Sequence, residues 1–186
     1  SDPAANLYKL YFVEPGQNRT SGMDGLISTQ PPASNADQVT ASALDDDVQF
    51  MSISMMSTLE LFGRKFFANE THYVPVELFL KSEGPQNSNV DWTVSIMTTE
   101  RTLGSTTYSG SVCTASFGSS CDFDHEIIDV GIGSSESFDV RKGERLIVKV
   151  RASMSGCDGG NSPFGGSDCS ADVAFNRIDN EPNKFS

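Results

Sequence analysis

The sequence predicts an all-β protein, a two-layer antiparallel β-sandwich with jelly-roll or Greek-key strand order. Apolar side chains recur with a period of two rather than about 3.6, which places them alternately on the two faces of a strand. Turn-forming residues separate nearly all of these apolar runs, and no segment carries an unbroken helical pattern. Roughly eight to ten short strands with some long connections favour a jelly roll over a simple meander.

The predicted strands follow the apolar runs in chain order. They are Leu7–Val13, Val48–Met55, Tyr73–Leu80, Trp92–Met97, Ile127–Val130, Phe138–Val140, Leu146–Met154 and Val173–Ile178. The stretch 14–47 is rich in Gly, Pro, Asn and Asp, so we expect a long early loop with at most a short strand at 26–28. Long loops of this kind are often functional.

The apolar pattern predicts a clear strand in one segment and is ambiguous in another. In the run 146–154, apolar residues share one face and basic residues the other; they are Leu146, Val148, Val150, Ala152 and Met154 against Arg145, Lys149 and Arg151. This is typical of a strand with one wet face. The segment 57–67 is ambiguous, because its apolar residues also fit one helical face, although Gly63 lies in its middle. We interpret it as a bent or bulged strand.

Length and charge limit the protein class. A chain of 186 residues suits a single sandwich domain, 1–186, and can bury a real core. Its net charge of -12 would repel nucleic acid and anionic lipid. No apolar stretch approaches the ~18 residues of a membrane helix, and Ser1–Asn6 is no signal peptide, so we expect a soluble, trimmed chain without membrane insertion.

The four cysteines indicate an oxidising compartment. Three pairings are open in principle, and proximity favours Cys113 with Cys121 and Cys157 with Cys169, each closing a Gly/Ser-rich loop (113–121 and 157–169). A zinc site is the alternative, but neither spacing forms the close C-x2-4-C pairs that such sites use. We therefore predict two disulfides and an extracellular or cell-surface location.

Part of the chain resembles a known family. The segment 137–150, in which the turn Lys142–Gly143 introduces an alternating strand, resembles the late strands of galactose-binding-like jelly-roll accessory domains. The segment 170–175 looks like the closing strand of such a domain. The resemblance implies carbohydrate-binding or adhesion roles, often with a structural calcium ion, and no catalysis.

Few residues suggest catalysis. The chain has two histidines, His72 and His125, and no G-x-S-x-G elbow, P-loop or H-E-x-x-H motif. The run 125–129 approaches the last motif, but on a strand its side chains do not converge. An acid–base couple of His125 with Asp124 or Glu126 is one interpretation, and a surface histidine among acids is the one we favour. We expect no enzyme activity.

Calcium is the cofactor that the acidic clusters would take, because hard cations bind several converging oxygen atoms. Asp45 and Asp47 precede a strand and point the same way, and Asp122 and Asp124 alternate ahead of another strand. The second cluster lacks the glycine of an EF-hand loop, since Ile127 stands at its sixth position. A hydrated acidic surface is the competing interpretation of every cluster.

Sugar binding needs exposed aromatic rings beside hydrogen-bonding groups. Phe117 and Phe164 lie in short polar loops that have no room to bury them, and Tyr108 is a third candidate. Trp92 alternates with Val94 and Ile96, which predicts a core position.

The sequence leaves two functions open. The leading hypothesis is a non-catalytic extracellular module that binds a glycan or a cell-surface protein, with calcium support. The alternative is a structural cell-surface or filament subunit, a spacer that self-assembles by strand addition through Leu7–Val13. Concentration-dependent assembly distinguishes the two.

Overall fold

The computed structural model of the chain describes residues 10–13, 22–28, 30–32, 38–42, 47–51, 65–114, 121–157 and 169–175. Within these ranges the chain forms twelve β-strands: β1 (Tyr11–Val13), β2 (Gly25–Ser28), β3 (Gln38–Ser42), β4 (Asp47–Met51), β5 (Lys65–Phe66), β6 (Thr71–Glu83), β7 (Asn89–Thr98), β8 (Thr102–Gly110), β9 (Asp124–Gly133), β10 (Phe138–Asp139), β11 (Leu146–Ser155) and β12 (Ser170–Phe175). No helix long and apolar enough to cross a bilayer occurs in this part of the chain.

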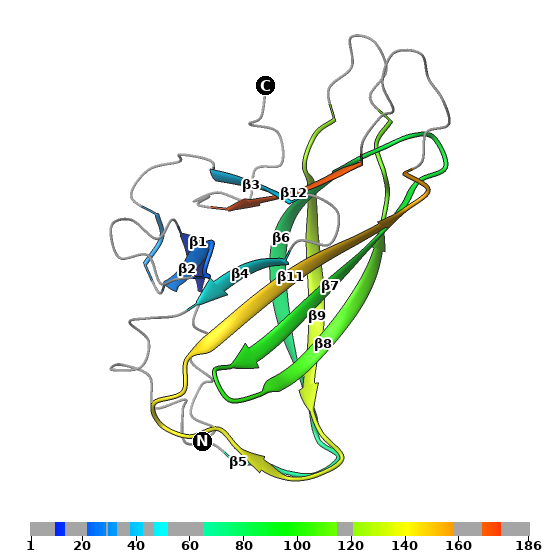
Figure 1. Cartoon of the computed structure of the whole chain (residues 1–186). Coiled ribbons are helices and arrows are strands. Elements are labelled where there is room, and N and C mark those ends of the chain that lie inside the picture. Colours follow the sequence, from blue (N-terminus) through cyan, green and yellow to red (C-terminus); the bar gives the residue numbers. More distant parts are fainter. Residues whose placement is uncertain are drawn as a thin grey trace, which may run out of the picture.

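The strand order is that of a jelly roll. One sheet has the order β3-β12-β6-β9, and the other has the order β1-β2-β4-β11-β7-β8. If β1, β2, β5 and β10 are set aside, the first remaining strand pairs with the last, the second with the second last, and so on inwards to β7 and β8. Such nested pairing wraps one long hairpin into two layers. Figure 1 shows the layer of β4, β11, β7 and β8 crossing over β6 and β9. The predicted fold class is confirmed.

Two strand pairs lie outside this pattern. The hairpin of β1 and β2 extends one sheet, and β2 joins β4 in parallel, with Gly25 opposite Phe50. This edge therefore departs from the antiparallel arrangement that the sequence predicts. Strand β10 pairs with β5, where the rings of Phe138 and Phe66 stack with centroids 4.9 Å apart. Phe138 thus belongs to a separate ribbon, seen at the bottom of Figure 1, and not to a strand of the sandwich.

Two strands of the sandwich are missing from the sequence prediction. Strand β3 falls within the stretch 14–47, which was expected to contain at most the short strand that is now β2. Strand β8 is rich in Thr, Ser and Gly, and Leu103 is its one buried residue. An edge strand buries little, so it needs few apolar residues. Instead, Ser105 and Thr107 pair by hydroxyl contacts of 3.1 Å with residues of β7.

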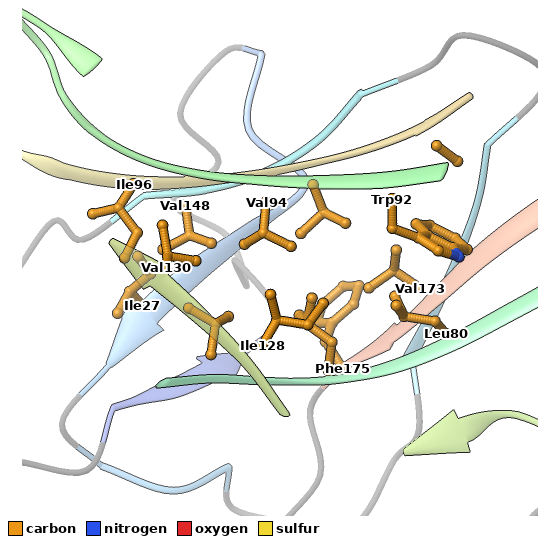
Figure 2. Packing of buried hydrophobic residues seen from close by; sticks show 14 of the residues in the cluster. Ile27, Leu80, Trp92, Val94, Ile96, Ile128, Val130, Val148, Val173 and Phe175 are labelled. Atoms are coloured by element: carbon orange, nitrogen blue, oxygen red, sulfur yellow. The ribbon is translucent and has the colours of Figure 1, made fainter. Parts of the chain in front are cut away.

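The alternating strands form one core between the layers. In β7, alternate residues are buried, from Val90 through Trp92 and Val94 to Ile96, and β11 adds Val148, Val150 and Ala152 in the register that the sequence predicts. Figure 2 shows Val94, Ile96 and Val148 facing side chains of the other sheet, with the Trp92 indole at one end of the row. Trp92 is 2% exposed, so its predicted core position is confirmed.

The sandwich closes where the edge strands β8 and β9 meet. A Cβ atom at Gly104 would overlap the carbonyl group of Gly131, so only glycine allows this approach of the two backbones. Farther along, the hydroxyl of Thr106 donates a hydrogen bond of 3.1 Å to the carbonyl of Asp129. The same two strands border the candidate site described next.

Candidate functional site at the disulfide end

One end of the sandwich, here called the disulfide end, gathers strand ends from both layers. The strand pairings place there Ser42, Asp47, Glu83, Asn89, Gly110, Asp124, Ser155 and Ser170. Both predicted disulfides are confirmed: Cys113–Cys121 joins the chain after β8 to the chain before β9, and Cys157–Cys169 does the same for β11 and β12. Two cross-links at one end hold the strand ends around it in place.

The turn 84–88 between β6 and β7 lies against both disulfides. Cys113 donates its N–H to the carbonyl of Ser82 at 2.9 Å, and its own carbonyl accepts from Gly84 at 3.0 Å. A Cβ at Gly84 would come within 3.0 Å of the Cys169 sulfur, so a larger residue would displace that bridge. The Ser88 hydroxyl contacts the carbonyls of Pro85 at 2.8 Å and of Gly156 at 3.1 Å. The end is therefore a connected, braced unit.

Beside this unit a small hollow opens between the edge strands β8 and β9. Its described lining comes from four strands and the residue after β8: Leu80, Ser82, Trp92, Tyr108, Gly110, Ser111, Asp124 and Glu126. The free volume is about 10 Å³, which is space for roughly one water molecule. Its lining mixes aromatic rings, hydroxyl groups and carboxylates, and contains no basic residue among the described ones.

Tyr108 and Glu126 form the polar contact across the hollow. The phenol donates a hydrogen bond of 2.6 Å to Oε1 of Glu126. This hydrogen bond, with smaller contributions from burial and from the charges of Glu126 and Asp124, raises the pKa of Tyr108 to about 12. The phenol is a neutral hydrogen-bond donor at physiological pH.

Trp92 forms the apolar wall. It lies directly opposite Tyr108 in the β7–β8 pairing. A Cβ at Gly110 would come within 3.1 Å of Nε1 and Cδ1 of the indole, so the glycine leaves that edge of the ring uncovered by a side chain. The indole N–H has no hydrogen-bond partner within the part of the chain that the structure describes.

The structure brings two of the predicted site residues together and separates others. Tyr108 and Asp124 both line the hollow, whereas exposed Asp122 lies outside its lining. Phe117, Phe164 and Asp45 fall outside the described residues, and of Asp47 only the backbone, at the start of β4, is described. Their predicted roles stay predictions.

His125 has a different partner from its sequence neighbours. Its Nε2 lies 2.8 Å from Oε1 of Glu77 on β6, and its ring stacks on Phe79 with centroids 4.8 Å apart. The interpretation in which it pairs with Asp124 or Glu126 is wrong, because adjacent residues of a strand point to opposite faces. His125 lies on the outer face of its sheet, while the two acids point toward the hollow.

Sequence reasoning missed several residues of the site. Ser82 and Ser111 carry no motif, and only the pairing of β6, β8 and β9 brings them to the hollow. Outside the site, it also missed Tyr73, which at 70% exposure is the most exposed large hydrophobic side chain of the described part. The alternation in β6 predicts this exposure, because Tyr73 lies on the opposite face of the strand from buried Val76 and Leu78.

Comparisons with known proteins add little. No family model and no curated protein matches the chain. Solved structures with some likeness include the structure of infectious bursal disease virus Gt strain (14% identity, TM-score 0.30, 76% of this chain and 32% of that one). Another is a mutant VP2 protein of the same virus, in derived particles; it is 10% identical with a TM-score of 0.22, and the match covers 84% of this chain and 39% of that one. The chain covers 32% and 39% of the lengths of these two proteins. The jelly-roll assignment rests on the strand pairings alone.

Proposed function

We propose that this protein is a non-catalytic extracellular binding module that holds a glycan at the disulfide end. One observation carries the proposal: a hollow with two aromatic rings, two carboxylates and two serines lies next to a unit braced by two disulfides. Sugars present polar hydroxyl rims, which the carboxylates and serine hydroxyls of this lining can hydrogen-bond, and apolar C–H faces, which the partly exposed Tyr108 ring can contact. Binding residues are commonly held by loops on a rigid scaffold, and the disulfides supply that rigidity here.

The contacts of the described histidines support a non-catalytic role. His125 is stacked on Phe79 and paired with Glu77 on the outer face, away from the hollow. Nε2 of His72 lies 3.7 Å from Oε2 of Glu70, and the His72 ring contacts the Phe66 ring edge to face. Neither arrangement places a general base against a nucleophile, which is the geometry that covalent or acid–base catalysis requires.

Calcium support is a weaker part of the hypothesis. Calcium takes about six to eight oxygen ligands. Among the described residues no group of three or more His, Cys, Asp or Glu side chains converges on one point. The described lining of the hollow holds two carboxylates, Asp124 and Glu126, and Oε1 of Glu126 already accepts the Tyr108 hydrogen bond. These residues do not fit a calcium site, and the proposal assigns no step to the ion.

The test is binding of the purified protein to a broad glycan array, in millimolar calcium and again in EDTA. We expect a saturable signal that weakens in Tyr108→Phe. Tyr73→Phe is the matched control, because it removes the same hydroxyl group from an exposed tyrosine outside the hollow. A blank array with the folded protein would contradict the proposal. A signal that persists in EDTA would show that calcium is dispensable.

A structural subunit is the second candidate. Strand β1 stands at the end of the six-stranded sheet, with β2 of its own chain on one side. An end strand is the place where a second chain joins a sheet by strand addition. Light scattering over a wide concentration range tests this. Growth of the particle mass that is blocked by a proline at Phe12 would favour assembly, and a constant monomer mass would exclude it.

A further inference from the structure

The size of the hollow sets the first condition on its occupant. A free volume of about 10 Å³ admits one group the size of a water molecule and no sugar ring. A ligand held there must therefore insert a single small group, while the rest of it lies outside.

The residues that line the hollow set the second condition on the ligand group, because they offer both a hydrogen-bond donor and acceptors. Trp92 is 98% buried, and its indole N–H lacks a partner among the described residues. The N–H is therefore a donor that a ligand atom with a lone pair can accept from. Glu126 uses Oε1 for the Tyr108 hydrogen bond, and its Oε2 and the carboxylate of Asp124 remain acceptors. The Ser82 hydroxyl already donates to the carbonyl of Ser111 at 2.8 Å.

These conditions discriminate between chemical classes. A hydroxyl group accepts from the indole N–H and donates to a carboxylate at the same time. An ammonium group has no lone pair for the indole, and a phosphate or carboxylate ligand would meet the negative charges of Asp124 and Glu126. A neutral hydroxyl group satisfies both walls and can take the place of the one water molecule for which the hollow has room.

We propose that the hollow is the seat of a single hydroxyl group of a neutral sugar, held between the Trp92 N–H and the carboxylates of Asp124 and Glu126. This inference rests on the proposed function and specifies it: the ligand is an uncharged glycan that projects one hydroxyl or hydroxymethyl group between β8 and β9. Acidic glycans are disfavoured. Tyr108 orients the Glu126 carboxylate and is a positioning residue.

The single tryptophan of the chain provides a direct probe, because its indole N–H gives one resonance in a proton–nitrogen correlation spectrum. The labelled protein is titrated with methyl glycosides of neutral hexoses, and separately with methylammonium chloride and inorganic phosphate. We expect a saturable shift of the Trp92 resonance with at least one neutral glycoside and none with the two ions. Glu126→Gln should weaken the fitted affinity roughly tenfold or more, since a charged acceptor is lost.

Control variants separate binding from folding. Tyr73→Phe should titrate as the unaltered protein does, and a dispersed spectrum shows that Glu126→Gln is folded. Tyr108→Phe should weaken binding in the otherwise unaltered protein. In a protein that already carries Glu126→Gln it should have no further effect, because Tyr108 acts by orienting Glu126.

The outcomes distinguish this inference from the proposed function. A glycan-array signal with an unmoved Trp92 resonance would overturn the hydroxyl seat and leave glycan binding intact. Shifts with neutral glycosides but a blank array would support the seat and contradict recognition of the displayed glycans. No shift with any neutral glycoside, or an equal shift with methylammonium, would overturn the inference.

Discussion

The phenol of Tyr108 and the carboxylate of Glu126 are joined by a hydrogen bond of 2.6 Å that links the edge strand of one sheet to the edge strand of the other. Together with the Thr106 hydrogen bond to Asp129 and the close approach of Gly104 and Gly131, it closes the sandwich between β8 and β9. It borders the hollow and so connects the stability of the sandwich to the proposed site.

The first prediction concerns this bridge at high pH. The pKa of Tyr108 is raised from 10.0 to about 12, so between these values the folded protein holds a proton that the unfolded chain has lost. The stabilisation is therefore complete below pH 10 and is lost as the pH rises toward 12. The free energy of unfolding, measured with urea, should fall more steeply between pH 10 and 12 for the unaltered protein than for the Tyr108→Phe variant. Equal slopes would contradict the bridge.

The second prediction concerns Glu144, which is 5% exposed and accepts a hydrogen bond of 2.8 Å from the N–H of Arg141. Burial by itself would raise its pKa, but hydrogen bonds from Thr98 and Arg141, and the charges of Arg101 and Arg141, lower it overall. Stability should thus be present above the ordinary carboxyl pKa of 4.5 and be lost as the pH falls through the lowered value.

Glu144→Gln should lower the free energy of unfolding at neutral pH by about 1–3 kcal/mol. It should also flatten the acid limb of the stability profile, measured by urea unfolding between neutral and acidic pH. Exposed Glu136→Gln is the control, for which we expect a change within about 0.5 kcal/mol. A Glu144→Gln protein as stable as that control would show that the buried carboxylate is not required.

The third prediction concerns the disulfides. Replacing Cys157 and Cys169 by alanine, or Cys113 and Cys121, should destabilise the protein by about 2–4 kcal/mol for each pair. The loss has a second source beyond chain entropy, because the turn 84–88 contacts both bridges. Thermal unfolding with and without reductant measures it. Reduction that leaves the melting temperature unchanged would refute a bracing role.

The fourth prediction concerns the close approach of β8 and β9. Gly104→Ala places a Cβ against the carbonyl of Gly131, and backbone cannot yield as a side chain can. We expect a loss of roughly 1–3 kcal/mol or more in the free energy of unfolding. Gly131→Ala is the matched variant across the same gap: its Cβ would meet the side chains of Thr71 at 3.3 Å and Tyr73 at 3.5 Å, which can move. We expect Gly131→Ala to lose less stability than Gly104→Ala. A larger loss in Gly131→Ala would contradict this account.

Much of the fold follows from local sequence pattern. Alternation over Leu146–Met154 and Trp92–Met97 specifies which side chains are buried, because a strand has only two faces and a shift of one residue would bury Arg151 or Lys149. Cysteine spacing specified both disulfides for a related reason, since short Gly/Ser-rich loops bring their ends together at small entropic cost.

The candidate site was predictable only in part. Tyr108 and Asp124 were named from the sequence for different roles, one as a sugar platform and one as a calcium ligand. Their meeting in one hollow depends on β9 starting opposite Leu80 and on Tyr108 of β8 pairing with Trp92 of β7. These pairings join residues far apart in the chain, so no local spacing encodes them.

The sequence by itself therefore determined the all-β class, the buried faces of the long strands and the disulfide pairing, because each depends on neighbours within one strand or one short loop. Only the tertiary structure decided the jelly-roll order, the strands β3 and β8, the partner of His125 and the hollow beside Trp92. Those features arise from long-range pairing, in which an edge strand with few apolar residues is held by its partner strands rather than by its own pattern.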